Sequence, residues 1–296
     1  MTDMGMATGT ADAAVIIPHY NDVIRLKRCL TSLMQNDDRN GVEIIVVDNG
    51  STQSLEEVIA EFPNIRFLVE PKKGAAAARN RGVAETTAPF LFFIDADCVA
   101  APDWLTVARD VVLKADLTGG RVDVFDETPP PRSGAEAFEA VFGFNFKKYI
   151  EVQGFTGAGN LVTSRAVFNS VGPFRGGVSE DVDWSKRAVA MGHKLIYEDR
   201  LVVGHPSRSD WVALRHKWRR MTEELCATNG TDLKARFRWG LRALAMPASA
   251  LVHSPKVIFS DRLNGIGERL RGLGVLFRLR LLRMIWMLRQ TAGLSI

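Results

Sequence analysis

The sequence predicts an α/β fold with a mainly parallel central sheet, helices on both faces of that sheet, and a basic helical extension at the C-terminal end. Three observations predict this fold. The first half alternates short apolar runs with helical patterns, those runs lack polar alternation, and positive charge gathers after residue 204. Such uninterrupted apolar runs are typical of parallel strands that helices cover on both faces. A chain of 296 residues is long enough for one large α/β domain and an appendage.

The elements of the first half follow one another as strand and helix. The expected strands are Ala13–Ile17, Glu43–Val47, Ile65–Val69 and Phe90–Ile94, and the expected helices between them are Asp22–Gln35, Ser51–Glu61 and Gly74–Glu85. Ser51 or Thr52 is expected to cap the second of these helices. Because ligands bind where parallel strands end, the carboxyl ends of the four strands are the expected place for a site.

After residue 120 the pattern is less regular. A helix is expected over 134–151, where an aromatic stripe indicates either core packing or an acceptor groove; the stripe consists of Phe138, Phe142, Phe146 and Tyr149. A glycine-rich stretch that continues into a strand is expected over Gly154–Thr163. A helix over Ser179–Met191 and two short strands over Lys194–Val203 complete this half.

The charge is divided unevenly along the chain. Residues 205–296 carry 17 Lys/Arg and 6 Asp/Glu, a balance of +11, whereas residues 1–204 carry 21 and 28, a balance of −7. A basic region of this kind is either a solvated surface or a surface that meets an anionic membrane or a nucleic acid. No nucleic-acid-binding module is recognisable, so no nucleic-acid partner is expected. Residues 269–290 carry an apolar helical stripe with flanking arginines, which allows membrane docking, a packed helical subdomain or a dimer contact.

Cysteine usage and the chain start bear on the compartment. Cys29, Cys98 and Cys226 are few and far apart, which suits a reducing compartment better than a disulfide framework. The first residues are small and polar without a signal segment, so a loose tail is expected over 1–12. No apolar run is long enough to predict a membrane span. These features predict a cytoplasmic protein, peripheral on the inner face of the cell membrane if the basic region docks there.

Polar or small residues follow each of the four predicted strands. They are Pro18–Asn21, Asp48, the small-residue segment Gly74–Gly82 with Arg79, and the pair Asp95 and Asp97. Two carboxylates this close at a strand end suit Mg²⁺ or Mn²⁺, which neutralises a diphosphate. Each feature alone also has a structural explanation as a turn, a helix cap or tight helix packing. Because parallel strands end at one edge of a sheet, the repetition in order indicates one binding site.

Three further residues have chemistry to offer. Glu180 and Asp181 stand at an expected helix start, where acids usually act as caps but where a carboxylate is also able to deprotonate an acceptor hydroxyl. His205 follows an apolar run and is either structural or a metal ligand beside a carboxylate. A dinucleotide-dependent oxidoreductase is disfavoured, because the turn after the first strand has no glycine fingerprint.

Taken in order, these segments resemble the inverting family 2 glycosyltransferases, which have the GT-A nucleotide-sugar-binding fold. The matching segments are 15–22, 46–51, 74–82, 93–97 and 179–183. The resemblance covers roughly residues 13–206 and implies a catalytic domain with a nucleotide-binding half over 13–120 and an acceptor half over 121–206. Residues 207–296 are then the helical basic C-terminal region.

The resemblance implies roles for the residues on the donor side. Pro18, Tyr20 and Asp48 would line the nucleoside pocket, with Asp48 contacting the base. Arg79 would lie near the base or the diphosphate. Asp95 would contact the ribose, and is also a candidate metal ligand.

The resemblance also implies a metal and a base. Asp97 and His205 would bind Mn²⁺ or Mg²⁺, the metal bridging the diphosphate. Asp181 resembles the catalytic base of the family, and Glu180 is its nearest competitor. One displacement would then invert the anomeric centre.

The implied reaction transfers one sugar from a nucleotide-sugar donor, with a UDP-sugar as the better guess, to a glycan or lipid-linked acceptor. Polymer-forming members carry a Gln-x-x-Arg-Trp motif, whereas residues 215–220 here read Arg-His-Lys-Trp-Arg-Arg. Single-sugar transfer is therefore the expectation. The alternative is a catalytically silent relative that holds a nucleotide-sugar or scaffolds a glycan synthase complex. The sequence leaves the oligomeric state open.

Overall fold

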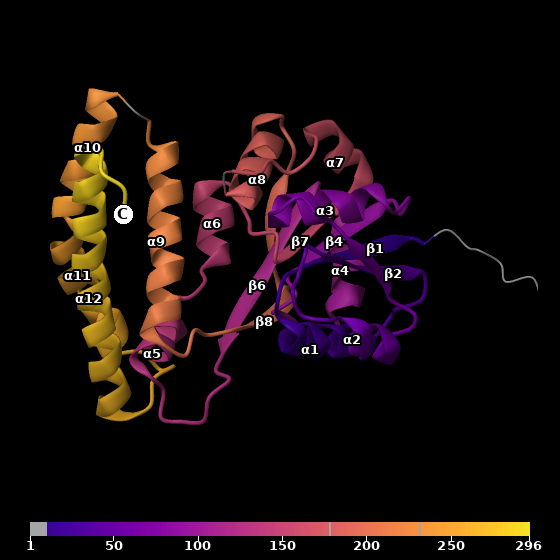
Figure 1. Ribbon diagram of the computed structural model, residues 1–296, viewed down its shortest axis with the longest axis horizontal. Coiled ribbons are helices and arrows are strands. Elements are labelled where there is room, and N and C mark those ends of the chain that lie inside the picture. Colours follow the sequence, from indigo (N-terminus) through magenta and orange to yellow (C-terminus); the bar gives the residue numbers. More distant parts are fainter. Residues whose placement is uncertain (1–10, 178, 231) are drawn as a thin grey trace, which may run out of the picture. The chain divides into compact units, whose positions relative to one another are not determined.

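The computed structural model describes residues 11–177, 179–230 and 232–296 (Figure 1). The chain divides into two compact units. Unit 1 runs to Asp123 and resumes over Asn145–His205, and unit 2 consists of Val124–Phe144 and Pro206–Ile296. Most of the tail expected over 1–12 lies outside the described residues. The expected catalytic range of 13–206 stays a prediction, since a compact unit is not by itself a functional domain.

Among the described residues, eight strands form one sheet. They are β1 (Ala13–His19), β2 (Val42–Asp48), β3 (Arg66–Val69), β4 (Phe90–Ile94), β5 (Val99–Ala100), β6 (Leu117–Phe125), β7 (Asn160–Ser164) and β8 (Leu195–Pro206). Their order across the sheet is β3-β2-β1-β4-β7-β6-β8-β5. The pairs among β1 to β4 are parallel, as expected, whereas β7 joins both β4 and β6 antiparallel and β5 joins β8 antiparallel. One strand, β8, replaces the two short strands expected over Lys194–Val203.

The helices of unit 1 lie between the strands in the chain. They are α1 (Val23–Met34), α2 (Glu56–Glu61), α3 (Ala75–Ala84), α4 (Trp104–Val112), α6 (Phe146–Gln153), α7 (Arg165–Val171) and α8 (Glu180–Ala190). Unit 2 contains α5 (Gly134–Phe142), α9 (Trp211–Thr228), α10 (Leu233–Leu244), α11 (Met246–Ile258) and α12 (Gly265–Thr291). The helical basic region expected after residue 206 is thus present.

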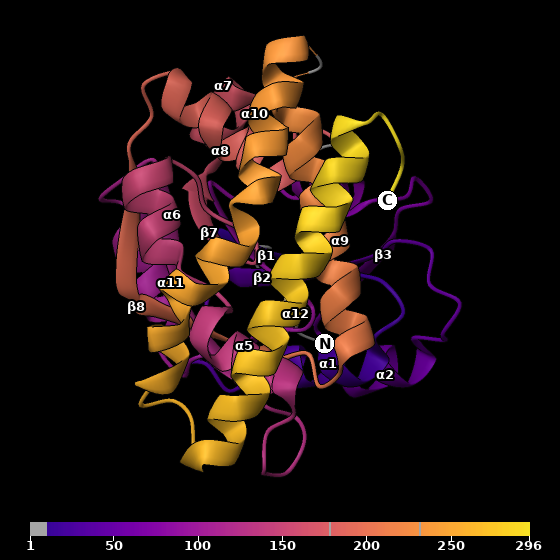
Figure 2. The ribbon, with the colours of Figure 1, turned by 90° about the vertical axis from the view of Figure 1, so that its left-hand side faces the viewer.

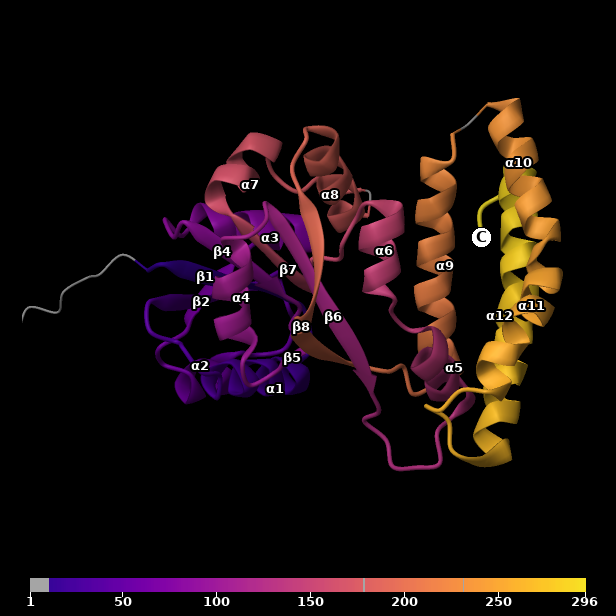
Figure 3. The same cartoon turned by 180° about the vertical axis from the view of Figure 1, so that it is seen from behind.

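The sheet of unit 1 has a buried core on each face. Val15 and Ile17 of β1 point into a cluster with the buried residues of α1, α2 and α4, and Ala14 and Ile16 point into a second cluster with α3, α7 and α8. Figure 3 shows α4 on one of these faces. Successive side chains of a strand point to opposite faces, so a strand covered on both faces must be apolar throughout. This is the physical reason for the uninterrupted apolar runs.

Helix α3 lies unusually close to the sheet. A Cβ atom at Gly82 would stand 2.6 Å from Ile16 Cγ2 and 3.3 Å from Val47 Cγ2. Ala76 and Ala78 of the same helix are buried against this face. Gly82, Ala76 and Ala78 therefore serve packing, one of the two explanations that the sequence allowed for the segment 74–82.

The helix expected over Ser51–Glu61 is shorter than predicted. Helix α2 begins only at Glu56, without a side-chain cap. Ser51 instead directs its backbone N–H and its hydroxyl to Asp48, and the Thr52 N–H donates to Asn21 Oδ1 at 2.7 Å. Tertiary partners therefore take up the capping groups, and residues 51–55 form a loop that joins two strand ends.

The helix expected over 134–151 is two helices. It is interrupted after Phe142, and Asn145 starts α6 by accepting a hydrogen bond from the Lys148 N–H at 3.1 Å. Phe138 and Phe142 consequently belong to unit 2, whereas Phe146 and Tyr149 belong to unit 1. The aromatic stripe is thus not one surface. Phe138 is a buried core residue of α5 in unit 2.

Helix α12 is the central helix of unit 2. It packs against α5, α9, α10 and α11, and Figure 2 shows α10 and α11 following one another along it. Leu276, Leu279 and Trp286 of α12 are buried in these contacts. The packed helical subdomain is therefore what this stretch forms within unit 2. None of the described helices has both the length and the apolar character needed to cross a membrane.

Candidate active site

The ends of β1 and β2 are joined by a histidine–aspartate pair. His19 is buried, and its Nδ1 lies 3.0 Å from Asp48 Oδ1. The Asp22 backbone N–H donates to His19 Nε2 at 3.2 Å. Because a backbone N–H can only donate, Nε2 is the acceptor nitrogen, so Nδ1 carries the proton and donates to Asp48. The sequence placed His19 within the candidate segment Pro18–Asn21 but gave it no role of its own.

Asp48 is held as a carboxylate. Burial raises its pKa, but hydrogen bonds from the Ser51 hydroxyl, the Ser51 N–H and His19 outweigh burial, so the pKa lies below its ordinary value. These bonds also fix the orientation of the carboxylate at the sheet edge. Pro18, one residue before His19, lies half-buried in β1 opposite Val47 of β2.

A tyrosine and a lysine face each other beside this pair. Tyr20 is 55% exposed, and Lys73 Nζ lies 4.5 Å from the centre of its ring. Lys73 Nζ also donates to the Gly50 carbonyl at 3.2 Å. An exposed ring next to a cation is able to stack on a base while the cation approaches a phosphate. The sequence offered only a weak signal for Lys73, a lysine immediately before Gly74.

Asn49 positions the loop that carries Lys73. Its Oδ1 accepts from the Gly74 N–H at 2.7 Å, and its Nδ2 donates to the carbonyls of Glu70 at 3.0 Å and Lys72 at 2.7 Å. The side chain is buried, so these bonds form away from water. Asn49 therefore links the end of β2 to the start of α3.

Arg79 of α3 holds two acids that are far apart in the chain. Its Nη2 lies 2.6 Å from Asp95 Oδ1, and its Nη1 lies 2.8 Å from Glu180 Oε1. Arg79 is only 4% exposed. Burial alone lowers the pKa of Arg79, but Asp95, Glu180 and Asp181 together raise it. In this structure both terminal nitrogens bind carboxylates, so the contact with base or diphosphate expected for Arg79 stays a prediction.

Asp181 has a different environment from Glu180. It is half-buried at the first turn of α8, and no cation forms an ion pair with it among the described residues. Burial and the nearby Glu180 raise its pKa, Arg79 lowers it, and the result is about 6. Glu180, by contrast, is bound to Arg79. Of the two acids expected near the reacting hydroxyl, Asp181 thus has the environment of a base.

A glycine pair brings the backbone between the two groups of acids. A Cβ atom at Gly159 would stand 2.6 Å from Asp95 Oδ2, and one at Gly157 would stand 3.4 Å from Asp181 Oδ2 and 2.8 Å from the Phe146 ring. Only glycine allows so close an approach. Residues 157–159 therefore border both Asp95 and Asp181. The sequence indicated only that this stretch is rich in glycine and did not predict its neighbours.

Asp97 and His205 meet through strand pairing. Val99 of β5 lies opposite Gly204 of β8, and this register places Asp97 Oδ2 3.3 Å from His205 Nε2. Asp95 instead has its Oδ1 2.6 Å from Arg79 Nη2. Among residues 11–177, 179–230 and 232–296, no group of three His, Cys, Asp or Glu side chains is arranged to hold a metal. The expected set of Asp95, Asp97 and His205 is thus present only as the pair.

Asp97 and His205 together offer ligands that suit Mn²⁺ or Mg²⁺ and leave further coordination positions of the ion open. A carboxylate oxygen and an imidazole nitrogen supply two ligands, and these ions commonly take the rest from diphosphate oxygens and water. Cys29 and Cys98 are not suited as metal ligands in place of this pair. Burial raises the pKa of each thiol most, and the charges of Asp97 and Asp95 raise it further.

With this geometry described, comparison with known proteins decides the family. The model for glycosyl transferase family 2 matches residues 14–172. The chain belongs to glycosyl transferase family 2. It is 30% identical to the glycosyltransferase AglE of Haloferax volcanii over 70% of each chain. It is also 29% identical to the pre-mycofactocin glycosyltransferase of Mycobacterium tuberculosis over 68% of this chain and 45% of the relative. This alignment spans less than half of the second relative's own length.

Solved structures agree on the fold of this family 2 glycosyltransferase. The mannosyltransferase PcManGT from Pyrobaculum calidifontis, solved with GDP-Man and Mn²⁺, aligns with a TM-score of 0.56 over 98% of this chain and 77% of its own, at 15% identity. S. aureus TarS in complex with UDP aligns with a TM-score of 0.53 over 95% of this chain and 92% of its own, at 14% identity. At these identities the likeness concerns the fold alone. These structures confirm the predicted GT-A fold, and the family match together with the relative AglE confirms the predicted transferase activity.

Proposed function

We propose that this glycosyltransferase transfers one sugar from a nucleoside diphosphate sugar to an acceptor hydroxyl with inversion, and that Asp181 is its base. The observation that carries the proposal is the contrast between two neighbouring acids: Glu180 is neutralised by Arg79, whereas Asp181 is not and has a pKa of about 6. A carboxylate with a raised pKa takes a proton from a hydroxyl more readily than an ordinary one.

On the donor side, Tyr20, Lys73 and Asp48 would hold the nucleoside diphosphate. Tyr20 presents an exposed ring for stacking, and Asp48 is a fixed carboxylate that accepts hydrogen bonds from a base or a ribose. Lys73 lies beside the ring with its ammonium group available to a phosphate. Pro18 would close the pocket on the β1 side, and Asp95, fixed by Arg79, would meet the ribose.

Asp97 and His205 would hold Mn²⁺ or Mg²⁺. When bound, the ion would supply positive charge against the negative charge that builds on the leaving diphosphate. The chain itself orients the pair through the β5–β8 register, while Arg79 binds one carboxylate oxygen of Asp95.

Asp181 would accept the proton of the acceptor hydroxyl while the hydroxyl oxygen forms a bond to the anomeric carbon and the bond from that carbon to the diphosphate breaks. A single displacement of this kind inverts the centre. Gly157 keeps side chains away from Asp181, so an acceptor is able to approach the carboxylate.

The donor nucleotide and the acceptor complete the proposal. The related folds hold GDP-Man and UDP, and a UDP-sugar is our choice from the frequency of such donors in the family. We further propose a glycan or lipid-linked acceptor, and a cytoplasmic protein that is peripheral to the membrane. The alternative is a catalytically silent relative that holds a nucleotide-sugar or scaffolds a synthase complex.

Two isosteric substitutions test the base. Asp181→Asn is expected to lower the turnover of donor and acceptor by about 10²- to 10⁴-fold, while calorimetry shows donor affinity within about twofold of the wild type. The matched control, Glu180→Gln, is expected to lose only about tenfold, since it disturbs positioning and not proton transfer. Turnover by Asp181→Asn at the level of Glu180→Gln would reject Asp181 as the base. Donor binding by the wild type without any nucleoside diphosphate release would favour the silent alternative.

Asp97→Ala tests the metal pair separately. We expect calorimetric Mn²⁺ binding in the presence of UDP to weaken by about 10- to 100-fold, because one of two ligands is lost. Equal Mn²⁺ affinity in variant and wild type would count against Asp97 as a ligand.

A further inference from the structure

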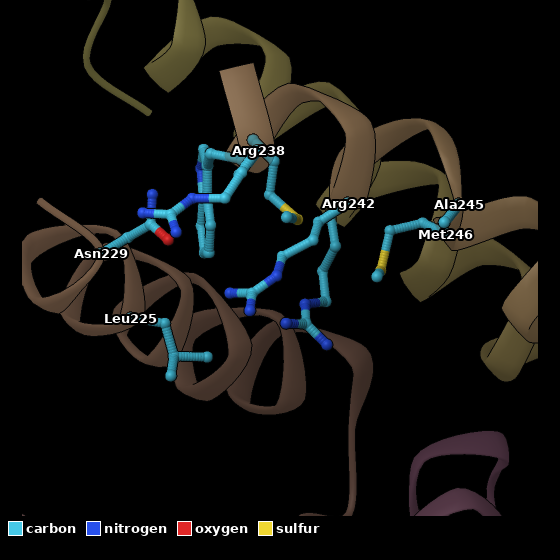
Figure 4. Close-up of a pocket in the computed structure, with 9 residues that line it drawn as sticks. Leu225, Asn229, Arg238, Arg242, Ala245 and Met246 are labelled. Carbon is cyan, nitrogen blue, oxygen red and sulfur yellow. The ribbon is translucent and has the colours of Figure 1, made fainter. Parts of the chain in front are cut away.

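Unit 2 contains a pocket lined by arginines and apolar side chains. It has a volume of about 510 Å³, and its lining residues come from α10, α12, the end of α9 and the start of α11. They are Leu225, Asn229, Arg238, Trp239, Arg242, Ala245, Met246, Arg283 and Met287. Figure 4 shows the side chains of Arg238 and Arg242 extending from α10 towards the end of α9. Three cations and no anion line this pocket.

Arg283 is the most unusual of these residues. It is only 8% exposed, and its Nε is buried without a hydrogen-bond partner. Its guanidinium carbon lies 4.7 Å from the centre of the Trp218 ring. This cation–π contact stabilises the positive charge, but the ring offers no hydrogen-bond acceptor to the N–H groups of Arg283. Burial and the neighbouring Arg280 lower the pKa of Arg283 to about 10. A buried cation in this condition is costly unless an anion joins it.

The acids of unit 2 do not supply that anion. Glu139 binds Arg208 at 3.1 Å and Lys217 at 2.6 Å, and Glu268 binds Arg132 at 3.3 Å. Among the residues that the structure describes, no carboxylate forms an ion pair with Arg238, Arg242 or Arg283. Unit 2 thus pairs its charges elsewhere and leaves the pocket cations to an external group.

The surface next to the pocket is apolar. Leu233, Phe237 and Leu241 recur every four residues along α10, and each is more than half exposed. Arg238 and Arg242 directly follow Phe237 and Leu241, so a cationic row and an apolar row run side by side along the helix. A second exposed apolar group is formed by Leu251 and Val252 of α11 and by Phe259, the residue that follows this helix. A helix with adjoining cationic and apolar rows is suited to the interface of an anionic membrane.

We propose that the pocket of Arg238, Arg242 and Arg283 binds the phosphate group of an anionic membrane lipid, with α10 and α11 in contact with its apolar chains. The guanidinium groups match phosphate oxygens, and Trp239, Met246 and Met287 line the remainder of the pocket for the apolar part next to the phosphate. The site differs from the apolar stripe with flanking arginines expected over residues 269–290, because only Arg283 and Met287 of α12 line the pocket. The inference rests on the peripheral membrane association proposed above, but the pocket uses no residue of the sugar-transfer site, so a failure of lipid binding and a failure of sugar transfer are separate results.

Vesicle sedimentation with the full chain tests the pocket. The wild type is expected to bind vesicles of phosphatidylcholine mixed with phosphatidylglycerol at least about tenfold more tightly than vesicles of phosphatidylcholine alone. Arg238→Gln with Arg242→Gln should lose most of this preference. The control variant, Arg219→Gln with Arg220→Gln on α9, removes the same charge from exposed arginines and should lose at most about threefold. Equal losses in both double variants would overturn the pocket in favour of a diffuse charge effect.

Calorimetry separates the lipid from a free anion. Dihexanoyl phosphatidylglycerol below its micelle concentration is expected to bind the wild type, and inorganic phosphate at the same concentration is expected to bind at least about tenfold more weakly. Phe237→Ser with Leu241→Ser should weaken vesicle binding. A lipid would be overturned as the ligand if inorganic phosphate bound as tightly as the short-chain lipid. The same would follow if the Phe237→Ser and Leu241→Ser variant bound vesicles as tightly as the wild type. Asp181→Asn should leave every one of these values unchanged.

Discussion

Arg79 in unit 1 and Arg283 in unit 2 are both more than nine-tenths buried, yet their charges are balanced differently. Arg79 places one terminal nitrogen on Asp95 and the other on Glu180, whereas Arg283 lies over an indole ring and meets no carboxylate of the described chain. The pKa of Arg79 is raised and that of Arg283 is lowered to about 10, in each case with burial as the largest influence towards a lower value. The difference teaches that a buried cation can organise a site that is already complete or can mark one that awaits an anion.

The largest expected effect comes from removing Arg79. Arg79→Met leaves Asp95 and Glu180 without their cation, and we expect the free energy of unfolding to fall by about 3–5 kcal/mol. Urea denaturation at neutral pH measures the change, and Arg79→Lys, which keeps the charge, should lose less. A decrease below about 1 kcal/mol for Arg79→Met would show that the two carboxylates do not depend on it.

The next effect concerns Asp181 and depends on pH. Its pKa is about 6 in the folded chain and 3.8 as its ordinary value, so between these values the folded state binds more protons and stability falls as the pH rises. Asp181→Asn removes this penalty. The free energy of unfolding of this variant is expected to exceed that of the wild type by about 3 kcal/mol at pH 8, with no such gain below pH 4. Denaturant titrations at both pH values measure the difference, and an equal change at both would contradict the raised pKa.

Arg283→Met should act in the direction opposite to Arg79→Met. It replaces an unpartnered buried cation by an apolar side chain of similar length, so we expect unfolding in lipid-free buffer to require about 1–2 kcal/mol more. Thermal denaturation measures the gain, and vesicle binding should weaken in the same variant. If Arg283→Met destabilised the chain as much as Arg79→Met, both arginines would have to be neutralised within the folded chain.

The smallest effect tests the exposed arginines. Arg238→Gln with Arg242→Gln should change the free energy of unfolding by no more than about 0.5 kcal/mol, because both side chains are exposed and lack ion pairs. Urea denaturation checks this value beside the lipid measurements. A loss above about 2 kcal/mol would give these residues a structural role instead.

The surroundings of Arg79 show which parts of the site a sequence pattern can predict and which it cannot. The four parallel strands and the polar residues at their ends were predictable, because burial on both faces leaves an uninterrupted apolar run and the ends share one edge. The partners of Arg79 were not, since Glu180 is 101 residues away and only the folded chain brings it near. Lys73 and Gly157 were likewise hidden, because their neighbours come from distant segments.

Local patterns failed where tertiary contacts took over. Ser51 and Thr52 have the chemistry of helix caps, but in the structure they donate to Asp48 and Asn21 instead of capping a helix. For α12 the sequence left membrane docking, a packed helical subdomain and a dimer contact open, and the buried Leu279 and Trp286 show that one side of the helix packs inside unit 2. A period of 3.6 identifies a helix without stating which neighbour covers it.

The discontinuous make-up of unit 2 has a practical consequence for shortened forms of the chain. Helix α5 lies in the middle of the sequence but is covered by α12, where Gly272 packs against Ala137. Ending the chain near residue 206 would therefore bare the apolar face of α5 and strip Glu139 of both Arg208 and Lys217. An expressed fragment that is meant to retain only unit 1 needs a short linker in place of residues 124–144 as well.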